Sequence, residues 1–194
     1  MLRKGLIQLR AIEPTDIDCL YQWENDPESW KVSDANAPLS RYAIEQFVLN
    51  SHQDIYTTRQ LRWMIDLMQE SGGIKTIGCV DLFEFEPRHQ RAGVGILIGE
   101  NSERSKGYSK LALSLLLDYA FNALQLHQVH CLVATTNAPS LALFKGLGFE
   151  QIGIKKDWVH DGDSWSDQVA LQLLSGKYFQ AMDVGEDLLN GSSF

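Results

Sequence analysis

The chain has 194 residues, of which 44% are hydrophobic and 22% charged, and its formal net charge is −8. This length and composition predict one compact domain with a substantial core and little disorder. The acidic balance disfavours binding to nucleic acid or to an anionic membrane and mildly favours cationic partners. No apolar run reaches about 18 residues, so we expect neither a membrane span nor a signal peptide, and the cytoplasm is the expected location.

The three cysteines, Cys19, Cys79 and Cys131, are widely spaced and have apolar neighbours. They form no CxxC pair, so the sequence supports neither a disulfide framework nor a zinc site. A small core residue is the plainer interpretation for each of them. We therefore expect no metal in the function of this chain.

The first half of the chain predicts one strand, two helices and then three more strands. Ser40 can cap the second helix, because its hydroxyl precedes an amphipathic run. Gly72 and Gly73 fit a turn between the first two strands of the later group. The expected strands are 6–11, 61–68, 74–85 and 92–98, and the expected helices are 16–24 and 40–51.

The second half predicts two helices and three strands. The segment 106–123 has apolar residues at i, i+3, i+4 and i+7 spacing and is the clearest helix of the chain. Pro139 and Gly148 fit the first turn and the C-terminal end of a shorter helix. The remaining expected strands are 129–135, 149–158 and 165–174.

The resulting order β-α-α-β-β-β-α-β-α-β-β mixes hairpins with βαβ units. We therefore predict an α/β (α+β) fold, with a mixed, mostly antiparallel twisted sheet of about seven strands and helices on both faces. Residues 1–180 would form this single domain. The tail 181–194 is acidic and ends in small polar residues, so we expect it to be loosely ordered.

A short polar loop between the strand 92–98 and the helix after it is the most informative stretch. It contains Arg104, Lys106 and Gly107. A helix start presents unpaired N–H groups and a partial positive charge, which together bind phosphate, and a glycine there lets the backbone approach a ligand. The chain has no Walker sequence and no GxGxxG after a strand, which disfavours ATP and dinucleotides. Taken alone, the loop is a weak signal, and a solvated helix N-terminus is the plainer interpretation.

The strand, loop and helix together resemble the acetyl-CoA pyrophosphate motif of the GNAT superfamily of N-acetyltransferases, which stands here as Arg104, Gly107 and Ser109. A second segment, from Asn137 to Phe149, resembles the family's N-x-x-A-x-x-x-Y-x-x-x-G-F sequence. These two motifs occur in the family's order and on the expected elements.

The opening Leu9-Arg10, with Glu13, Asp16 and Leu20, resembles the L-R-x-x-x-x-x-D start of the ribosomal-protein and spermidine acetyltransferase branch of that superfamily. The resemblance extends over roughly residues 6–178. It implies an enzyme that moves an acetyl group from acetyl-CoA onto a primary amine by direct attack on the thioester.

The resemblance also implies which residues hold the cofactor. The backbone of the strand ending at Ile98 would pair with pantetheine, the loop amides would hold the pyrophosphate, and Asn137 with Phe144 would flank the thioester. The implied cofactor-binding residues are Ile96, Leu97, Ile98, Arg104, Ser105, Lys106, Gly107, Tyr108, Ser109, Asn137 and Phe144.

Two positions depart from the family pattern. Ser105 stands where glycine is common, which predicts a tighter or shifted turn. Phe144 stands where a tyrosine often protonates the departing thiolate, and a phenyl ring cannot donate a proton. We therefore assign no general acid, and a CoA-binding sensor or scaffold without turnover is the alternative function.

A base is needed most for amines of high pKa. A lysine-like or polyamine nitrogen has a pKa near ~10.4, so its neutral form costs about 4.6 kcal/mol at pH 7, against about 1 kcal/mol for a peptide α-amine. Glu84 is the first candidate base and Asp81 the second, on the strand before the cofactor strand. Strand alternation places Glu84 and Asp81 on opposite faces of the sheet unless a bulge intervenes. The alternative role for either carboxylate is an ion pair with Arg88 or Arg91.

The amine is less well defined than the cofactor. Trp30 is the expected substrate contact, because the resemblance places its loop at the rim of the amine pocket, and His89 is a second candidate in a later loop. In the spermidine branch, acidic residues follow the aromatic residue of this loop, and another acidic residue is common in the cofactor strand. This chain has Lys31 after Trp30 and Gly93 in the cofactor strand, which weakens a polyamine assignment. A polyamine, a protein N-terminus and a small metabolic amine stay open, as does a longer acyl-CoA. A homodimer is common in the family.

Overall fold

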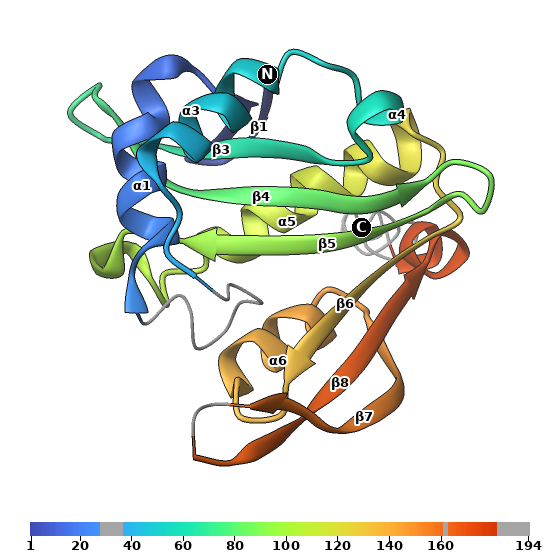
Figure 1. Cartoon of the computed structure of the whole chain (residues 1–194). Coiled ribbons are helices and arrows are strands. Elements are labelled where there is room, and N and C mark those ends of the chain that lie inside the picture. The colour runs from blue at the N-terminus through green and yellow to red at the C-terminus, as the bar shows by residue number, and fades with distance from the viewer. Residues whose placement is uncertain (28–36, 161–162, 182–194) are drawn as a thin grey trace, which may run out of the picture.

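The computed structural model describes residues 1–27, 37–160 and 163–181. Its eight described strands form one sheet in the order β1-β2-β3-β4-β5-β6-β8-β7, in which only the β5–β6 pair is parallel (Figure 1). The strands are β1 (Leu2–Lys4), β2 (Ile7–Ala11), β3 (Leu61–Met68), β4 (Ile74–Glu86), β5 (Arg91–Ile98), β6 (Gln128–Ala134), β7 (Glu150–His160) and β8 (Trp165–Leu174). The predicted mixed, mostly antiparallel sheet is confirmed.

The strand count is the main correction to the predicted fold. The expected seven strands lack β1, a three-residue strand that turns at Gly5 and pairs antiparallel with β2. Two of its three residues are exposed, so it carries almost no hydrophobic pattern for the sequence to reveal.

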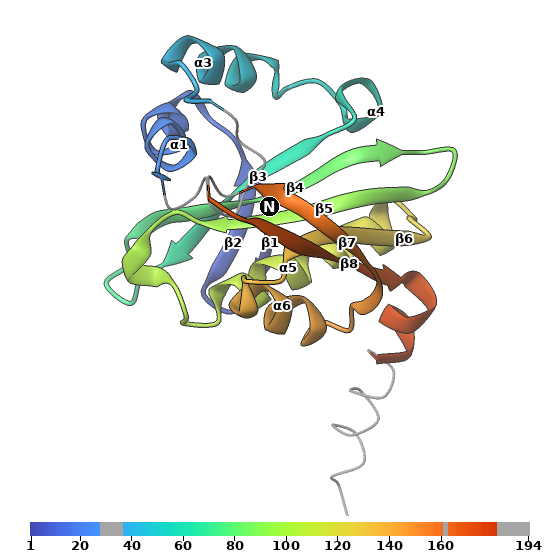
Figure 2. The ribbon, with the colours of Figure 1, turned by 60° about the horizontal axis from the view of Figure 1, so that its bottom comes forward.

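Helices cover both faces of the sheet, as predicted (Figure 2). One face carries α1 (Ile17–Glu24) and α3 (Arg41–Asn50), and the other carries α5 (Tyr108–Asp118) and α6 (Ala138–Lys145). The single-turn helix α4 (Ile55–Thr58), capped by Asp54, was not predicted, and residues 175–181 are also helical. Most of the predicted tail, together with the predicted contact Trp30, lies outside the described residues.

Hydrophobic side chains fill the space on each side of the sheet. The larger cluster packs α5 and α6 against the strands, and Cys131 belongs to it. The smaller cluster lies under α1 and α3 and contains Leu20, Trp23, Met64 and Cys79. Cys79 and Cys131 are therefore core residues, as expected from their apolar neighbours.

A buried ionic cluster fixes the start of the domain. Both Asp16 and Asp66 are 3% exposed, and Arg10 donates to Asp16 at 2.7 and 2.8 Å and to Asp66 at 2.8 Å. These hydrogen bonds raise the pKa of Arg10, so the guanidinium stays charged. The Leu9-Arg10 and Asp16 pattern therefore has a structural role, since it ties β2 to the turn before α1 and to β3.

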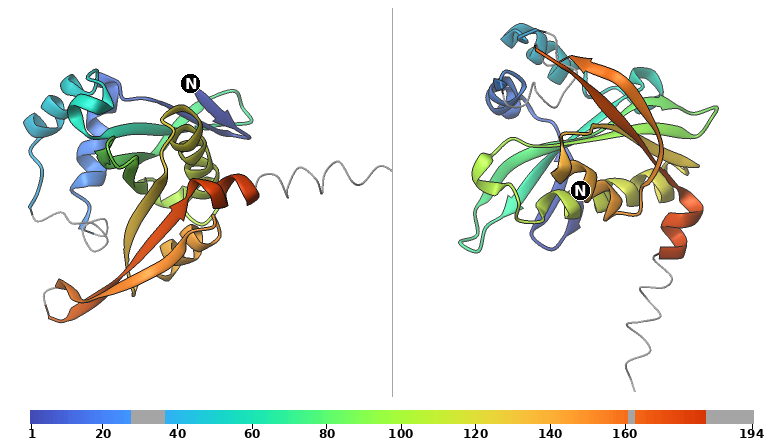
Figure 3. Two further views of the ribbon diagram at one scale, coloured as in Figure 1. Left: turned by 90° about the vertical axis from the view of Figure 1, so that its right-hand side faces the viewer. Right: turned by 90° about the horizontal axis from the view of Figure 1, so that it is seen from below.

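The two halves of the sheet separate along β5. The strands β5 and β6 pair only at Arg91↔Gln128, Ala92↔Val129 and Gly93↔His130. Beyond this point β5 continues to Ile98 along β4, whereas β6 continues along β8, and the two halves diverge (Figures 1 and 3). Among the described strands, none pairs with this edge of β5 from residue 94 to residue 98.

Candidate active site

A cavity of about 510 Å³ opens where β5 and β6 part, and we call it the loop cavity. It lies between the free edge of β5, the loop that begins α5, and the start of α6. Its lining residues are Ile96, Leu97, Ile98, Arg104, Ser105, Gly107, Ser109, Lys110, Asn137, Pro139, Ser140 and Leu143. Eight of the eleven predicted cofactor residues therefore meet in one cavity.

The start of α5 is open toward this cavity. Gly107 is its N-cap, has a φ of 84°, and no side chain caps the helix there. By contrast, the N-termini of α3, α4 and α6 are capped by Ser40, Asp54 and Asn137. A Cβ at Gly107 would have no heavy atom within 4 Å. The first amides of α5 are thus free of side-chain caps and fit an anionic diphosphate.

The cationic side chains at the start of α5 make different contacts. Arg104 donates from Nε to the carbonyl oxygen of Ile98 at 2.9 Å, which fastens the loop to the end of β5. Lys106 pairs with Glu103 at 2.9 Å and lies outside the cavity lining. Lys110, in the first turn of α5, lines the cavity and was missed, because it lies just beyond Ser109, the last residue of the predicted motif.

Three predicted cofactor residues lie outside the loop cavity: Lys106, Tyr108 and Phe144. Tyr108 packs against the main core. Phe144 is 4% exposed, and its ring centroid lies 5.1 Å from that of Phe149. Phe144 therefore belongs to the core, and the expectation that it flanks the thioester stays a prediction. Asn137 lines the cavity and accepts a hydrogen bond from the amide of Ser140 at 3.1 Å.

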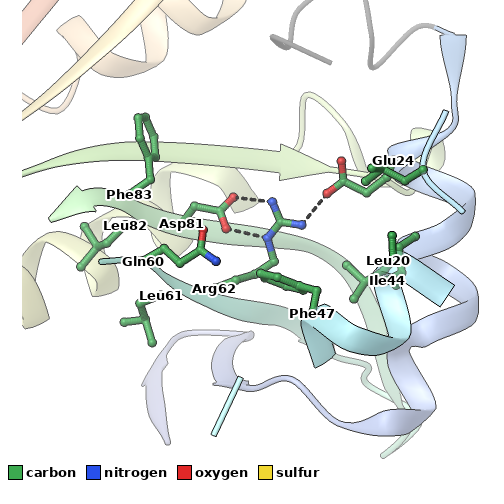
Figure 4. Close-up of a pocket in the computed structure, with 12 residues that line it drawn as sticks. Leu20, Glu24, Ile44, Phe47, Gln60, Leu61, Arg62, Asp81, Leu82 and Phe83 are labelled. Carbon is green, nitrogen blue, oxygen red and sulfur yellow. Dashed lines mark hydrogen bonds and ion pairs between the residues drawn. The ribbon is translucent and has the colours of Figure 1, made fainter. Parts of the chain in front are cut away.

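A second cavity, of about 460 Å³, lies between α1, α3 and the strands β3 and β4, and we call it the Arg62 cavity (Figure 4). Arg62 stands at its centre and bridges two carboxylates from different elements. Its Nε donates to Asp81 at 2.6 Å, a second nitrogen donates to Asp81 at 3.2 Å, and a third donates to Glu24. The ring of Phe47 covers the guanidinium, with 5.3 Å from Cζ to the ring centroid.

Burial and ion pairing act in opposite directions on this group of charges. Burial raises the pKa of Asp81, and Arg62 opposes that rise without cancelling it. Burial alone would lower the pKa of Arg62, but Asp81 and Glu24 bring it well above its usual value. Arg62 is therefore a permanent cation, and Asp81 is a carboxylate of raised basicity.

Asp81 also stands beside the free part of β5. It pairs with Gly95, and a Cβ at Gly95 would lie 3.8 Å from Oδ2 of Asp81 and 3.6 Å from the ring of Phe83. Gly95 comes two residues after Gly93, the last residue of β5 that pairs with β6. Asp81 therefore borders the point where the two halves of the sheet part.

Glu84 lies in a separate cavity, and a bulge interrupts β4 at this residue. The register shifts between Phe83 and Glu86, and Glu84 has a left-handed φ of 48°. It is exposed and lines a third cavity, of about 650 Å³, together with Arg59, Arg91 and His130, which we call the Glu84 cavity. The structure thus places Asp81, rather than the first-ranked Glu84, at the Arg62 cavity.

Two histidines, His89 and His130, lie near the ends of the strands β4, β5 and β6. His89 lies exposed in the turn between β4 and β5 and lines none of the three cavities described. His130, which sequence reasoning did not single out, is half-buried and pairs with Gly93 at the last contact of β5 with β6. Burial lowers its pKa, against the effect of Glu84, so its imidazole is neutral at pH 7.

Within the described ranges, no group of three or more His, Cys, Asp or Glu side chains is placed to hold a metal ion. The helices of the same ranges include none with the length and apolarity to cross a membrane.

Comparison with known proteins agrees with this architecture. The acetyltransferase (GNAT) domain family matches residues 7–150. An uncharacterized N-acetyltransferase p20 of Bacillus licheniformis is 26% identical over 172 residues, covering 89% of this chain and 94% of the relative. The spermidine N(1)-acetyltransferase of Vibrio cholerae is 24% identical over 172 residues, covering 89% and 95%.

A solved structure gives the same fold. The crystal structure of spermidine N-acetyltransferase from Vibrio cholerae in complex with CoA and spermine has a TM-score of 0.80 and 24% sequence identity, and the match covers 90% of this chain and 98% of that one. Since the family matches most of the sequence, this chain belongs to the GNAT acetyltransferases and is an N-acetyltransferase with acetyl-CoA as its co-substrate.

Proposed function

We propose that this chain acetylates a primary amine, which enters through the Arg62 cavity and attacks acetyl-CoA bound in the loop cavity. The observation that carries the proposal is the position of β5. Its residues 96–98 line the loop cavity, while its Gly95 lies against Asp81 of the Arg62 cavity. Asp81 and the lining of the loop cavity therefore adjoin the same stretch of β5, which β6 leaves unpaired.

The residues of the loop cavity fit the two ends of the cofactor differently. The unpaired backbone of Ile96, Leu97 and Ile98 would pair with pantetheine amides in the manner of an added strand. The amides from Ser105 to Ser109 would hold the diphosphate, because the helix start is uncapped and open. When bound, acetyl-CoA supplies an acetyl thioester that a neutral amine can attack.

We assign Asp81 the role of the carboxylate beside the reacting amine. Its raised pKa makes it a better proton acceptor than an exposed aspartate, and its charge attracts an ammonium ion. Arg62 occupies both of its oxygens, so the proton would pass through water rather than directly. Glu84 is the second candidate for this role, because it lines a cavity separate from the Arg62 cavity. Phe144 is buried away from the loop cavity, so the thiolate would take its proton from water.

The test is an amine panel with purified protein and acetyl-CoA, followed by release of the free thiol. The panel contains polyamines, peptides with a free N-terminus and small metabolic amines, with propionyl- and succinyl-CoA as alternative donors. Thiol release that depends on an amine supports the proposal. Tight CoA binding without turnover of any amine in the panel would refute the proposal that a primary amine of these classes is the acceptor.

A further inference from the structure

We infer that the acceptor is an amine with one cationic group on an apolar body, and that polyamines are poor substrates. The inference rests on the proposed function and names the class of amine that the Arg62 cavity admits. Three features of the cavity carry it: its apolar walls, its charge balance, and the guanidinium already present at its centre.

The walls of the cavity are mainly hydrocarbon. Eight of the twelve lining residues that the structure describes are apolar: Leu20, Leu39, Ala43, Ile44, Phe47, Leu61, Leu82 and Phe83. Leu39 is 41% exposed and Phe83 is 37% exposed, so part of this apolar surface faces solvent in the free protein. An alkyl or aromatic group would cover that surface and gain its burial free energy.

The charges of the lining match one ammonium ion. The described lining contains two carboxylates, of Glu24 and Asp81, and one guanidinium, of Arg62, which leaves a net charge of −1. One amine cation beside Asp81 balances this charge. A second cation on the same molecule would have no further carboxylate in the described lining and would meet the field of Arg62.

Arg62 itself takes the place that a second substrate cation would need. It lies between the two carboxylates and donates three hydrogen bonds to them (Figure 4). The ring of Phe47 shields it on one side. A polyamine would have to displace this guanidinium or bury an ammonium group against apolar side chains, and an unpaired buried charge is strongly unfavourable.

An isosteric pair of substrates tests the inference in the unmodified protein. Hexylamine and 1,5-diaminopentane have the same chain length and differ only in a terminal methyl against an ammonium group. We expect the kcat/KM of hexylamine to exceed that of the diamine by at least about tenfold, and 2-phenylethylamine to exceed spermidine likewise. Equal values, or a preference for the diamine and spermidine, would overturn the inference while leaving amine acetylation intact. Turnover of no amine at all would overturn the proposed function itself.

A pair of variants tests the part played by the guanidinium. Arg62→Met removes its charge and leaves both carboxylates, so we expect the ratio of hexylamine to diamine kcat/KM to fall by about tenfold. Arg62→Lys keeps the charge and should keep the ratio. An unchanged ratio in Arg62→Met would refute the role of Arg62, and the comparison in the unmodified protein stands whether or not this variant folds.

Discussion

Replacing Gly107 by aspartate tests the cofactor assignment, and asparagine at the same position is its matched control. Gly107 has a φ of 84°, a backbone conformation that costs an ordinary residue roughly 1–2 kcal/mol and that Asn and Asp tolerate better than most. A Cβ there meets no heavy atom within 4 Å, so neither side chain collides with the protein. We expect both variants to fold, with Tm lowered by about 2–4 °C per kcal/mol of strain.

The two variants differ only in charge, and Coulomb's law gives the size of the expected difference. A side chain at position 107 would point into open space at the mouth of the loop cavity. A carboxylate roughly 6 Å from one phosphate charge costs about 3 kcal/mol at an effective dielectric constant of about 20, which weakens binding about a hundredfold. Gly107→Asp should therefore bind CoA about a hundredfold more weakly than Gly107→Asn.

Isothermal titration with CoA measures this difference, and pantetheine, which lacks the diphosphate, provides the ligand control. The ratio of the two Kd values should approach one for pantetheine. It should also shrink for CoA as salt rises, because the position is exposed. Equal CoA affinities of the two variants at low salt would refute the assignment of the α5 N-terminus to the diphosphate.

Three further predictions follow from the described side chains. Asp81→Asn should lower kcat/KM for amines about a hundredfold with little change in CoA affinity, whereas Glu84→Gln should change kcat/KM much less. The opposite ranking in steady-state assays would make Glu84 the better candidate for the base. Burial raises the pKa of the Cys79 and Cys131 thiols to about 12. At pH 8 a thiol reagent should therefore label both roughly a thousandfold more slowly in the folded than in the denatured protein. Rapid labelling of the folded protein would contradict their burial. The pKa of His130 is lowered in the folded state, so the unfolded state binds a proton on this residue more readily, and stability should fall as pH drops below about 6.5. The denaturant midpoints at pH 7 and pH 5 should therefore differ less in His130→Gln than in the unmodified protein. The same difference in both proteins would refute this.

Local patterns in the sequence were sufficient for most elements of the fold. The predicted strand 61–68 matches β3, and Ser40 caps α3 as its sequence context indicated. The predicted helix 106–123 is shorter in the structure, because its last turn, Tyr119–Ala123, is a π-helix that the apolar spacing does not distinguish from α-helix. The strand β1 and the single-turn helix α4 are too short to show a period.

The residues of the loop cavity were largely predictable and those of the Arg62 cavity were not, for a physical reason. The loop consists of consecutive residues, so Arg104, Gly107 and Ser109 are recognisable in the sequence itself. The acceptor side depends on contacts between distant segments. Arg62 and Asp81 come together only when β3 pairs with β4, and no local pattern marks Arg62 as the residue that holds the carboxylate.

The sequence by itself determined the fold class, the family resemblance and the loop at the start of α5, because these depend on periodicity and on short-range spacing. Only the tertiary structure decided which carboxylate borders the free edge of β5. A bulge at Glu84 interrupts the strand alternation, and Phe144 packs in the core against Phe149. Both outcomes depend on how side chains pack across strands and helices, which spacing along the chain does not encode.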